Sequence, residues 1–205
     1  MNALGAQRQK IGRNGNHPSP KIYLLWRREL LKASYVDWAS KPSKEQQLFY
    51  YLLGVADSEG CFCVSLKKEP TTRFGFALDP MFHVTQHRNH SEVLDLFKQV
   101  LGCGRVIQKP GQPDTMQFMV DKRQELVERI IPFFEQFQPI VKARDFLLFK
   151  QIVLGLEEKK HSALEGLEYL VRLAFQMNDG GKQRRYSLQQ VFETINARAQ
   201  AKLLH

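Results

Sequence analysis

Long apolar runs are absent from this chain of 205 residues, because charged residues interrupt every candidate segment. No segment is therefore expected to cross a lipid bilayer, and no membrane partner is predicted. Cysteine is also scarce. The three cysteines, Cys61, Cys63 and Cys103, have neither zinc-ligand spacing nor the density of a disulfide framework. We expect a reducing intracellular compartment, with a chloroplast, a mitochondrion and a bacterial cytoplasm all left open.

No acidic residue occurs before Glu29, and the charge of the chain is unevenly distributed. Residues 1–44 carry nine lysines or arginines against two acidic residues, and they hold +7 of the net charge of +9. Such a basic N-terminal extension favours polyanions, because it releases counterions from phosphates. A solvated basic tail has the same composition. No apolar region follows its basic residues, so a secretory signal is not expected, and serine is too scarce to indicate a transit peptide.

The segment from Leu48 to Phe62 changes its hydrophobic period at Gly60. Helical spacing precedes this glycine and strict alternation follows it, which predicts a helix that runs directly into a strand. Glu59 is unusual in the last turn of such a helix, because its carboxylate faces the negative end of the helix dipole. A positive charge such as a divalent cation would offset it. Gly54 costs the helix about 1 kcal/mol relative to alanine and indicates a close approach. An ordinary buried helix with a solvated acidic end would give the same pattern.

The sequence from Ser43 to Leu156 predicts the order α-β-β-α-β-β-α-α, an α+β fold whose antiparallel sheet is covered by helices on one face. Two capping boxes, Ser43 with Gln46 and Asn89 with Glu92, predict helix starts. Pro132 is expected to kink or split a helix. The strands are predicted at 61–68, 74–86, 105–109 and 115–121. Beyond the helix that ends at Gly60, helices are predicted at 21–39, 91–101, 122–138, 142–156, 163–177 and 187–199.

One face of this sheet is left open, and alternate residues of the strands point toward it. Mixed donors and acceptors on a twisted sheet suit the edges of base pairs in a DNA major groove. A solvated sheet face has the same composition, so this pattern leaves both interpretations open. The predicted DNA contacts are Cys63, Ser65, Lys67, Glu69, Met81, His83, Arg105, Lys109, Thr115 and Gln117, with Arg73 and Arg88 beside the strands.

Residues 52–60, LLGVADSEG, match a signature nonapeptide at its first Leu, its Gly, its first Asp and its final Gly. Further matches follow in the same order: FHVTQ at 82–86, GCG at 102–104, FQP at 137–139 and KAR at 142–144. Together they make the sequence from 45 to 154 resemble the LAGLIDADG homing endonucleases, of the single-motif kind that acts as homodimers. The nonapeptide departs from the family pattern at four packing positions, and Glu59 stands where aspartate is commoner.

The resemblance implies an αββαββα domain at 45–156 with a saddle-shaped sheet, followed by a helical C-terminal extension at 157–205. In this family two signature helices pack side by side on a two-fold axis, which would place Tyr51, Gly54 and Val55 at a dimer interface. The final acid of each copy then lies over the DNA minor groove. Glu59 would bind a divalent ion there, Mg²⁺ or Mn²⁺, with help from the backbone carbonyl of Ser58.

The resemblance also assigns a second set of residues around the metal. Gln86 matches a glutamine that orients the attacking water, and either Lys142 or Arg144 lies where the family has a basic residue near the scissile phosphate. Asp57 is expected to be structural.

The implied function is site-specific, metal-dependent cleavage of both strands of DNA at a long pseudo-palindromic site, as in intron homing. The partners would be double-stranded DNA and a second copy of the chain. Two alternatives remain: a group I intron maturase, whose partner would be intron RNA, and a DNA-binding module that does not cleave. The intact Glu59 and Gln86 argue against the last of these.

Overall fold

The computed structural model describes residues 41–178 and 184–203, with side chains described as far as Ala201. The described residues from Pro42 onward belong to one compact unit. The helix predicted at 21–39 and most of the basic extension predicted at 1–44 lie outside the described residues. Among the described helices, none combines the length and the apolar character that a membrane span requires.

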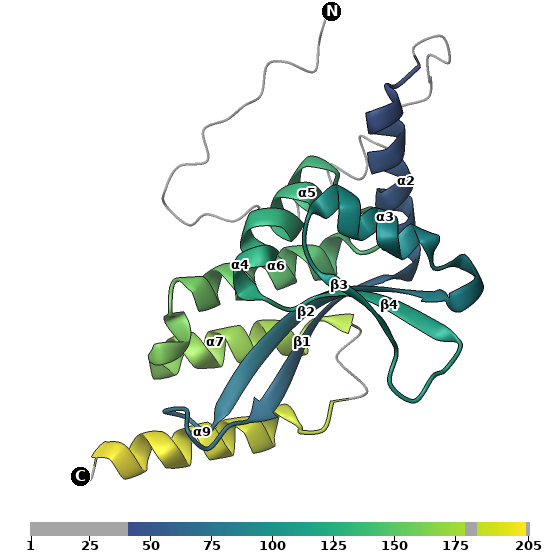
Figure 1. Cartoon of the computed structure of the whole chain (residues 1–205). Helices are drawn as coiled ribbons and strands as arrows, with labels where there is room; N and C mark the ends of the chain where they lie inside the picture. Colours follow the sequence, from purple (N-terminus) through teal and green to yellow (C-terminus); the bar gives the residue numbers. More distant parts are fainter. Residues whose placement is uncertain (1–40, 179–183, 204–205) are drawn as a thin grey trace, which may run out of the picture. The chain divides into compact units, whose positions relative to one another are not determined.

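A sheet of four antiparallel strands forms the centre of this unit. The strands are β1 Gly60–Lys68, β2 Phe76–His87, β3 Arg105–Gln108 and β4 Thr115–Val120. Their order in the sheet is β1-β2-β4-β3, so two hairpins lie side by side (Figure 1). Phe82 lies opposite Phe62 in one pair of strands and opposite Val120 in the other. Alternate residues of β1 and β2 are buried, as the period of two predicted. The predicted α+β class is therefore confirmed.

Helices pack against the buried face of the sheet. The first, α2 Lys44–Glu59, opens with the predicted capping box, in which the side chain of Ser43 accepts a hydrogen bond from the N–H of Gln46. After the first hairpin comes α3 Glu92–Leu101, and α6 Ala143–Glu157 follows the second hairpin. Their apolar side chains join those of the strands in a single core.

The helix predicted at 122–138 is interrupted near Pro132, as expected. It consists of three consecutive pieces, α4 Arg123–Glu125, a π-helical turn Leu126–Ile130 and α5 Ile131–Gln136. Proline lacks an N–H and its ring clashes with the preceding turn, and the wider π turn accommodates both effects. Phe134 of α5 then packs edge-on against Phe62 and Phe82, with ring centroids 4.9 and 5.1 Å apart.

The capping box predicted from Asn89 and Glu92 is wrong. A 3₁₀ turn, Arg88–His90, precedes α3, and the N-cap is Ser91, whose side chain makes no capping hydrogen bond. Asn89 lies inside this turn and is therefore too early in the chain to cap α3. Its own N–H donates to Nδ1 of His87 at 3.2 Å instead.

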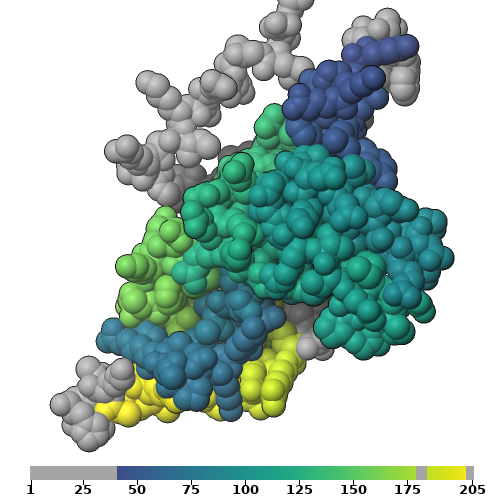
Figure 2. Space-filling view, viewed as in Figure 1, coloured from purple at the N-terminus to yellow at the C-terminus, as the bar shows by residue number. Residues whose placement is uncertain are grey.

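The residues after α6 pack on the same core as the sheet. They form a 3₁₀ turn, Lys160–Ser162, and the helices α7 Leu164–Phe175 and α9 Leu188–Leu203. Leu170 of α7 and Ile195 of α9 are fully buried in that core. Figures 1 and 2 show α9 beside the turn that joins β1 to β2, where Arg198 donates to the carbonyl of Pro70 at 2.9 Å.

Asn178 and Arg184, which lie between α7 and α9 in the chain, also cover the outer edge of β1, an edge strand of the sheet. The Nδ2 of Asn178 donates to the carbonyl of Phe62 at 3.1 Å, and the guanidinium of Arg184 donates to the carbonyl of Val64 at 2.9 Å. Unpaired groups on an edge strand are a template for pairing with another chain. These two side chains occupy the carbonyls that such pairing would use.

Candidate functional site

The end of α2 is joined to the start of α6 by the carboxylate of Asp57. Its oxygens accept hydrogen bonds from the backbone N–H groups of Ile140, Val141 and Lys142 at 2.9–3.0 Å. Ile140 and Val141 lie in the loop ahead of α6, and Lys142 is the N-cap of that helix. Asp57 therefore fixes this loop to the end of α2, which supports the structural role predicted for it.

We expect Asp57→Ala to lower the free energy of unfolding by about 1–3 kcal/mol, because the hydrogen bonds to the loop ahead of α6 are lost together. Urea unfolding followed by circular dichroism measures the change. Glu59→Ala on the same helix is the matched control, since Glu59 is exposed and pairs with no described residue. Its effect should stay within about 0.5 kcal/mol. Equal losses in the two variants would contradict this structural role of Asp57.

The ammonium group of Lys142 lies at the C-terminal end of α2. Its Nζ donates to the carbonyl of Asp57 at 2.5 Å and to that of Ser58 at 2.9 Å. A helix C-terminus has unpaired carbonyls and a partial negative charge, so a cation is stabilising there. Lys142 therefore supplies the positive charge that the sequence predicted at this end of the helix. Arg144 is exposed in the first turn of α6 and makes no hydrogen bond or ion pair with any described residue.

Glu59 ends α2 with an exposed carboxylate that has no partner in the described part of the chain. Gly60 begins β1 immediately afterwards, and a side chain there would place its Cβ 2.4 Å from the carbonyl oxygen of Ala56. Glycine therefore allows the helix to continue directly into the strand. This geometry holds Glu59 at the border between α2 and the sheet.

Gln86 lies near the end of β2, two residues beyond Val84, the partner of Gly60. Because the two strands are antiparallel, Gln86 extends past the start of β1 toward the end of α2. Its Oε1 accepts a hydrogen bond from the N–H of His87 at 3.0 Å. The predicted catalytic residues Glu59, Gln86 and Lys142 thus belong to one corner of the unit.

The strand pairing places most of the predicted DNA contacts on the open face of the sheet. Cys63, Ser65, Lys67, Met81, His83, Arg105, Thr115 and Gln117 share this face. Gln117 is the exception in exposure, since only 6% of it is accessible. The prediction missed other residues of the same alternation, which the period of two could have identified: Cys61, Ala77, Asp79, Thr85, His87, Ile107 and Met119.

The remaining predicted contacts lie in turns or at strand ends. Glu69 accepts a hydrogen bond from the hydroxyl of Thr71 at 2.6 Å, and Arg73 donates to the carbonyl of Ser162 at 3.1 Å. Lys109 follows β3 and pairs through its backbone with Thr115, at the base of the hairpin turn. These residues therefore border the open face and are not part of its strands.

Acidic neighbours pair with three of the basic residues predicted to contact DNA. The three ion pairs are Lys67 with Asp79, Arg105 with Asp121 through two hydrogen bonds of 2.6–2.7 Å, and Arg88 with Asp114 at 3.9 Å. The bonds from Arg105 hold the pKa of Asp121 below its usual value. The bond to Asp79 likewise raises the pKa of Lys67. Exposed pairs of this kind contribute little to stability, so polyanions can compete for the bases.

One face of α2 is not used by the fold of the single chain. A Cβ at Gly54 would meet nothing within 4 Å, and Tyr51 is 53% exposed. Leu52 and Ala56, by contrast, are buried against the core, and Val55 is partly buried. Among the described residues nothing near Gly54 requires a glycine, although the residue weakens the helix.

Comparison with known proteins accounts for this arrangement. The family model described as LAGLIDADG endonuclease matches residues 52–153, from the nonapeptide in α2 to α6. Homing endonuclease I-ApeII of Aeropyrum pernix is 32% identical over 149 residues, which cover 71% of this chain and 88% of the relative. The chain belongs to the LAGLIDADG homing endonuclease family.

Two further relatives support the LAGLIDADG assignment. DNA endonuclease I-CeuI of Chlamydomonas moewusii is 36% identical over 149 residues, covering 71% of this chain and 66% of the relative. The solved structure of the archaeal intron-encoded homing endonuclease I-Vdi141I, complexed with DNA, is 37% identical with a TM-score of 0.72. That match covers 77% of this chain and 99% of the other. The predicted family and the predicted LAGLIDADG fold are therefore confirmed.

The open face of this LAGLIDADG chain also brings together a group of side chains that could hold a metal. The ligand atoms of Cys61, Cys63 and His83 all lie within 4.8 Å of one another. A hydrogen bond between the two thiols lowers the pKa of Cys61 and raises that of Cys63. Burial, together with the charge of Lys109, lowers the pKa of His83. The sequence prediction had found no zinc-ligand spacing among the cysteines.

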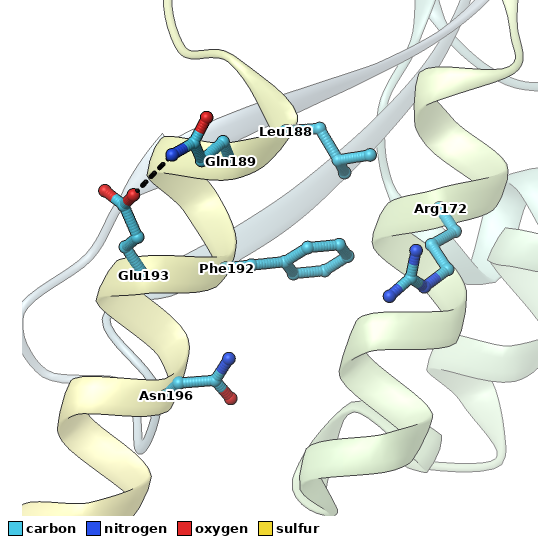
Figure 3. Close-up of a pocket in the computed structure, with 6 residues that line it drawn as sticks. All are labelled: Arg172, Leu188, Gln189, Phe192, Glu193 and Asn196. Atoms are coloured by element: carbon cyan, nitrogen blue, oxygen red, sulfur yellow. Dashed lines mark hydrogen bonds between the residues drawn. The ribbon is translucent and has the colours of Figure 1, made fainter.

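A surface hollow of about 630 Å³ lies between α7 and α9. Figure 3 shows Arg172 facing Phe192 across it, with the guanidinium 4.5 Å from the ring centroid. Gln189 donates to Glu193 at 2.9 Å on its rim. None of the residues predicted for cleavage or DNA contact lines this hollow.

Proposed function

We propose that this LAGLIDADG chain is a site-specific endonuclease that cuts both strands of DNA in intron homing. The observation that carries the proposal is the end of α2, where Glu59 has an exposed carboxylate and the carbonyl of its neighbour Ser58 accepts a hydrogen bond from the ammonium of Lys142. A carboxylate with no partner among the described residues, at a helix end that also binds a cation, suits the cleavage of a phosphodiester. The adjoining open face supplies the donors and acceptors that would read the bases.

The proposed enzyme acts as a homodimer on a long pseudo-palindromic site. Gly54 and Tyr51 support a second copy at α2, because both are exposed and a Cβ at the glycine would meet nothing in the described part of the chain within 4 Å. Packing of two α2 helices through this surface would bring the Glu59 of each copy toward the shared axis. A two-fold protein reads a two-fold site, which requires the pseudo-palindrome.

The proposed cofactor is Mg²⁺ or Mn²⁺, and the donors at the end of α2 fit such an ion. Hard divalent cations prefer oxygen ligands, and Glu59 offers an exposed carboxylate. The carbonyl of Ser58 already accepts a hydrogen bond from Lys142. A carbonyl oxygen has two lone pairs, so one remains for the ion. When bound, the ion activates water and stabilises the charge that develops at the scissile phosphate.

Three further residues have proposed roles in cleavage and DNA binding. Lys142, held by two carbonyl groups, keeps a positive charge beside the position of the scissile phosphate. This geometry favours Lys142 over Arg144 for that role, and it leaves the exposed Arg144 to the DNA backbone. Gln86 orients the attacking water through its amide, after giving up the hydrogen bond to its neighbour His87.

Cleavage of a DNA library tests the function directly. The full chain is incubated with a library of intron-insertion and randomised sequences in Mg²⁺, and the new ends are sequenced. We expect one pseudo-palindromic sequence to be enriched, cut on both strands, with no ends formed in excess chelator. Binding without cut ends in Mg²⁺ or Mn²⁺ would support the non-cleaving module instead. Cleavage in chelator would contradict the metal requirement.

We expect Asp121→Asn to raise the affinity for DNA about two- to fivefold, because breaking an exposed ion pair of about 0–1 kcal/mol releases Arg105. The slope of log affinity against log salt should steepen by about 0.9 if the freed guanidinium takes one phosphate. Salt titrations by fluorescence anisotropy measure both. Asp95→Asn, an exposed residue of α3 with no ion pair among the described residues, removes the same charge elsewhere. Identical effects of both variants would show that net charge, and not Arg105, is responsible.

A further inference from the structure

Two cysteines and a histidine converge on the open face at the start of the first hairpin. Cys61 and Cys63 are two residues apart on β1, so both side chains point to the same face. His83 of β2 is paired directly with Cys61. We propose that Cys61, Cys63 and His83 bind a thiophilic divalent cation, zinc, through side chains other than Glu59.

The distances between the ligand atoms are close to those of a tetrahedral zinc site. Zinc bonds of about 2.3 Å to sulfur and 2.0–2.1 Å to nitrogen place a sulfur and a nitrogen ligand about 3.6 Å apart, and two sulfurs about 3.8 Å apart. The Sγ of Cys63 lies 3.8 Å from Nδ1 of His83, and all three ligand atoms lie within 4.8 Å of one another. Small side-chain rotations therefore complete this part of the coordination shell, with no shift of the strands.

The surroundings of the three residues favour a soft cation over a hard one. Thiolate and imidazole ligands select zinc over magnesium, whereas Glu59 offers oxygen. The thiols are only partly buried, and charges of both signs lie near them, Asp145 and Lys142 near Cys61 and Asp79 and Arg184 near Cys63. A bound cation itself deprotonates a coordinating thiol.

Three protein ligands leave the fourth zinc position open. Met81 is paired with Cys63 and shares its face, so a soft thioether lies next to the site. A water molecule is the other occupant of this position. Bound zinc would connect β1 to β2 through side chains, just where the chain leaves α2.

Cobalt titration of the reduced full chain tests the site. Co²⁺ in a tetrahedral thiolate site gives a sulfur-to-metal charge-transfer band, which we expect to saturate at one ion per chain and to disappear on addition of Zn²⁺. Cys63→Ser and His83→Ala should each weaken cobalt binding at least about tenfold. Cys103→Ser is the control, because Cys103 is buried in the core and is not part of the cluster. Loss of the band in Cys103→Ser, or its persistence in Cys63→Ser, would overturn the proposal.

Thiol protection in the unaltered chain gives a second test that no folding defect can mimic. Zn²⁺ should slow the alkylation of Cys61 and Cys63 at least about tenfold, and the same concentration of Mg²⁺ should not. Mass spectrometry of the digested protein reports each cysteine separately. Equal alkylation rates with and without Zn²⁺ would refute the site. Because Glu59→Gln should retain cobalt binding, failure of the zinc site and failure of the proposed cleavage are separate results.

Discussion

Glu59→Gln is expected to abolish DNA cleavage while leaving the fold and the binding of DNA in Ca²⁺ largely intact. The carboxylate is exposed and pairs with no described residue, so its removal should cost the protein almost no stability. The amide keeps the shape of the side chain but loses the negative charge that holds a divalent ion. Such an ion supplies several kcal/mol of transition-state stabilisation, so we expect the rate to fall on the order of a thousandfold.

Single-turnover cleavage of the selected target by each variant measures this effect, with DNA binding in Ca²⁺ recorded in parallel. Glu45→Gln, in the first turn of the same helix, is the matched control because it removes an equal charge from an equally exposed position. It should cleave at the rate of the unaltered chain. A Glu59→Gln rate within tenfold of that value would remove Glu59 from the metal site.

The sequence predicted the sheet well because the signals for its strands are local. Alternation from Phe62 to Lys67 and the PGQPD turn at 110–114 each describe one hairpin, without reference to the rest of the chain. Alternation also assigned the open face correctly. It did not show that Asp79 and Asp121 neutralise Lys67 and Arg105, because side-chain partners across strands depend on register.

The candidate site was predicted only in part for the same reason. The pattern at Glu59 indicated that a positive charge was needed, but Lys142, which supplies one, is 85 residues from Asp57 in the chain. That Lys142, and not Arg144, reaches the end of α2 depends on the loop that Asp57 holds ahead of α6. The cluster at Cys61 was missed because its histidine comes from the neighbouring strand.

Gly54 provides the other large expected effect, since we expect Gly54→Leu to abolish the dimer and, with it, cleavage of the pseudo-palindromic site. A leucine side chain would stand where the partner helix has to approach. Gly54→Ala should separate a gain in the stability of the single chain from a loss in the stability of the dimer. In the single chain a Cβ at this position meets nothing within 4 Å, and alanine improves helix propensity by about 1 kcal/mol. The unfolding midpoint of the dilute protein should therefore rise in Gly54→Ala while the dimer weakens.

Sedimentation velocity over a range of concentrations measures the dimer, and thermal unfolding at the lowest concentration measures the single chain. Gly155→Ala is the contrasting variant, because a Cβ there would lie 2.7 Å from Cδ2 of Leu170, in the contact between α6 and α7. It should destabilise the single chain and leave the association of folded chains unchanged. If Gly54→Ala instead lowered the stability of the single chain, this glycine would serve the fold. A stable monomer of the unaltered protein on its target DNA would likewise exclude a two-fold axis at α2.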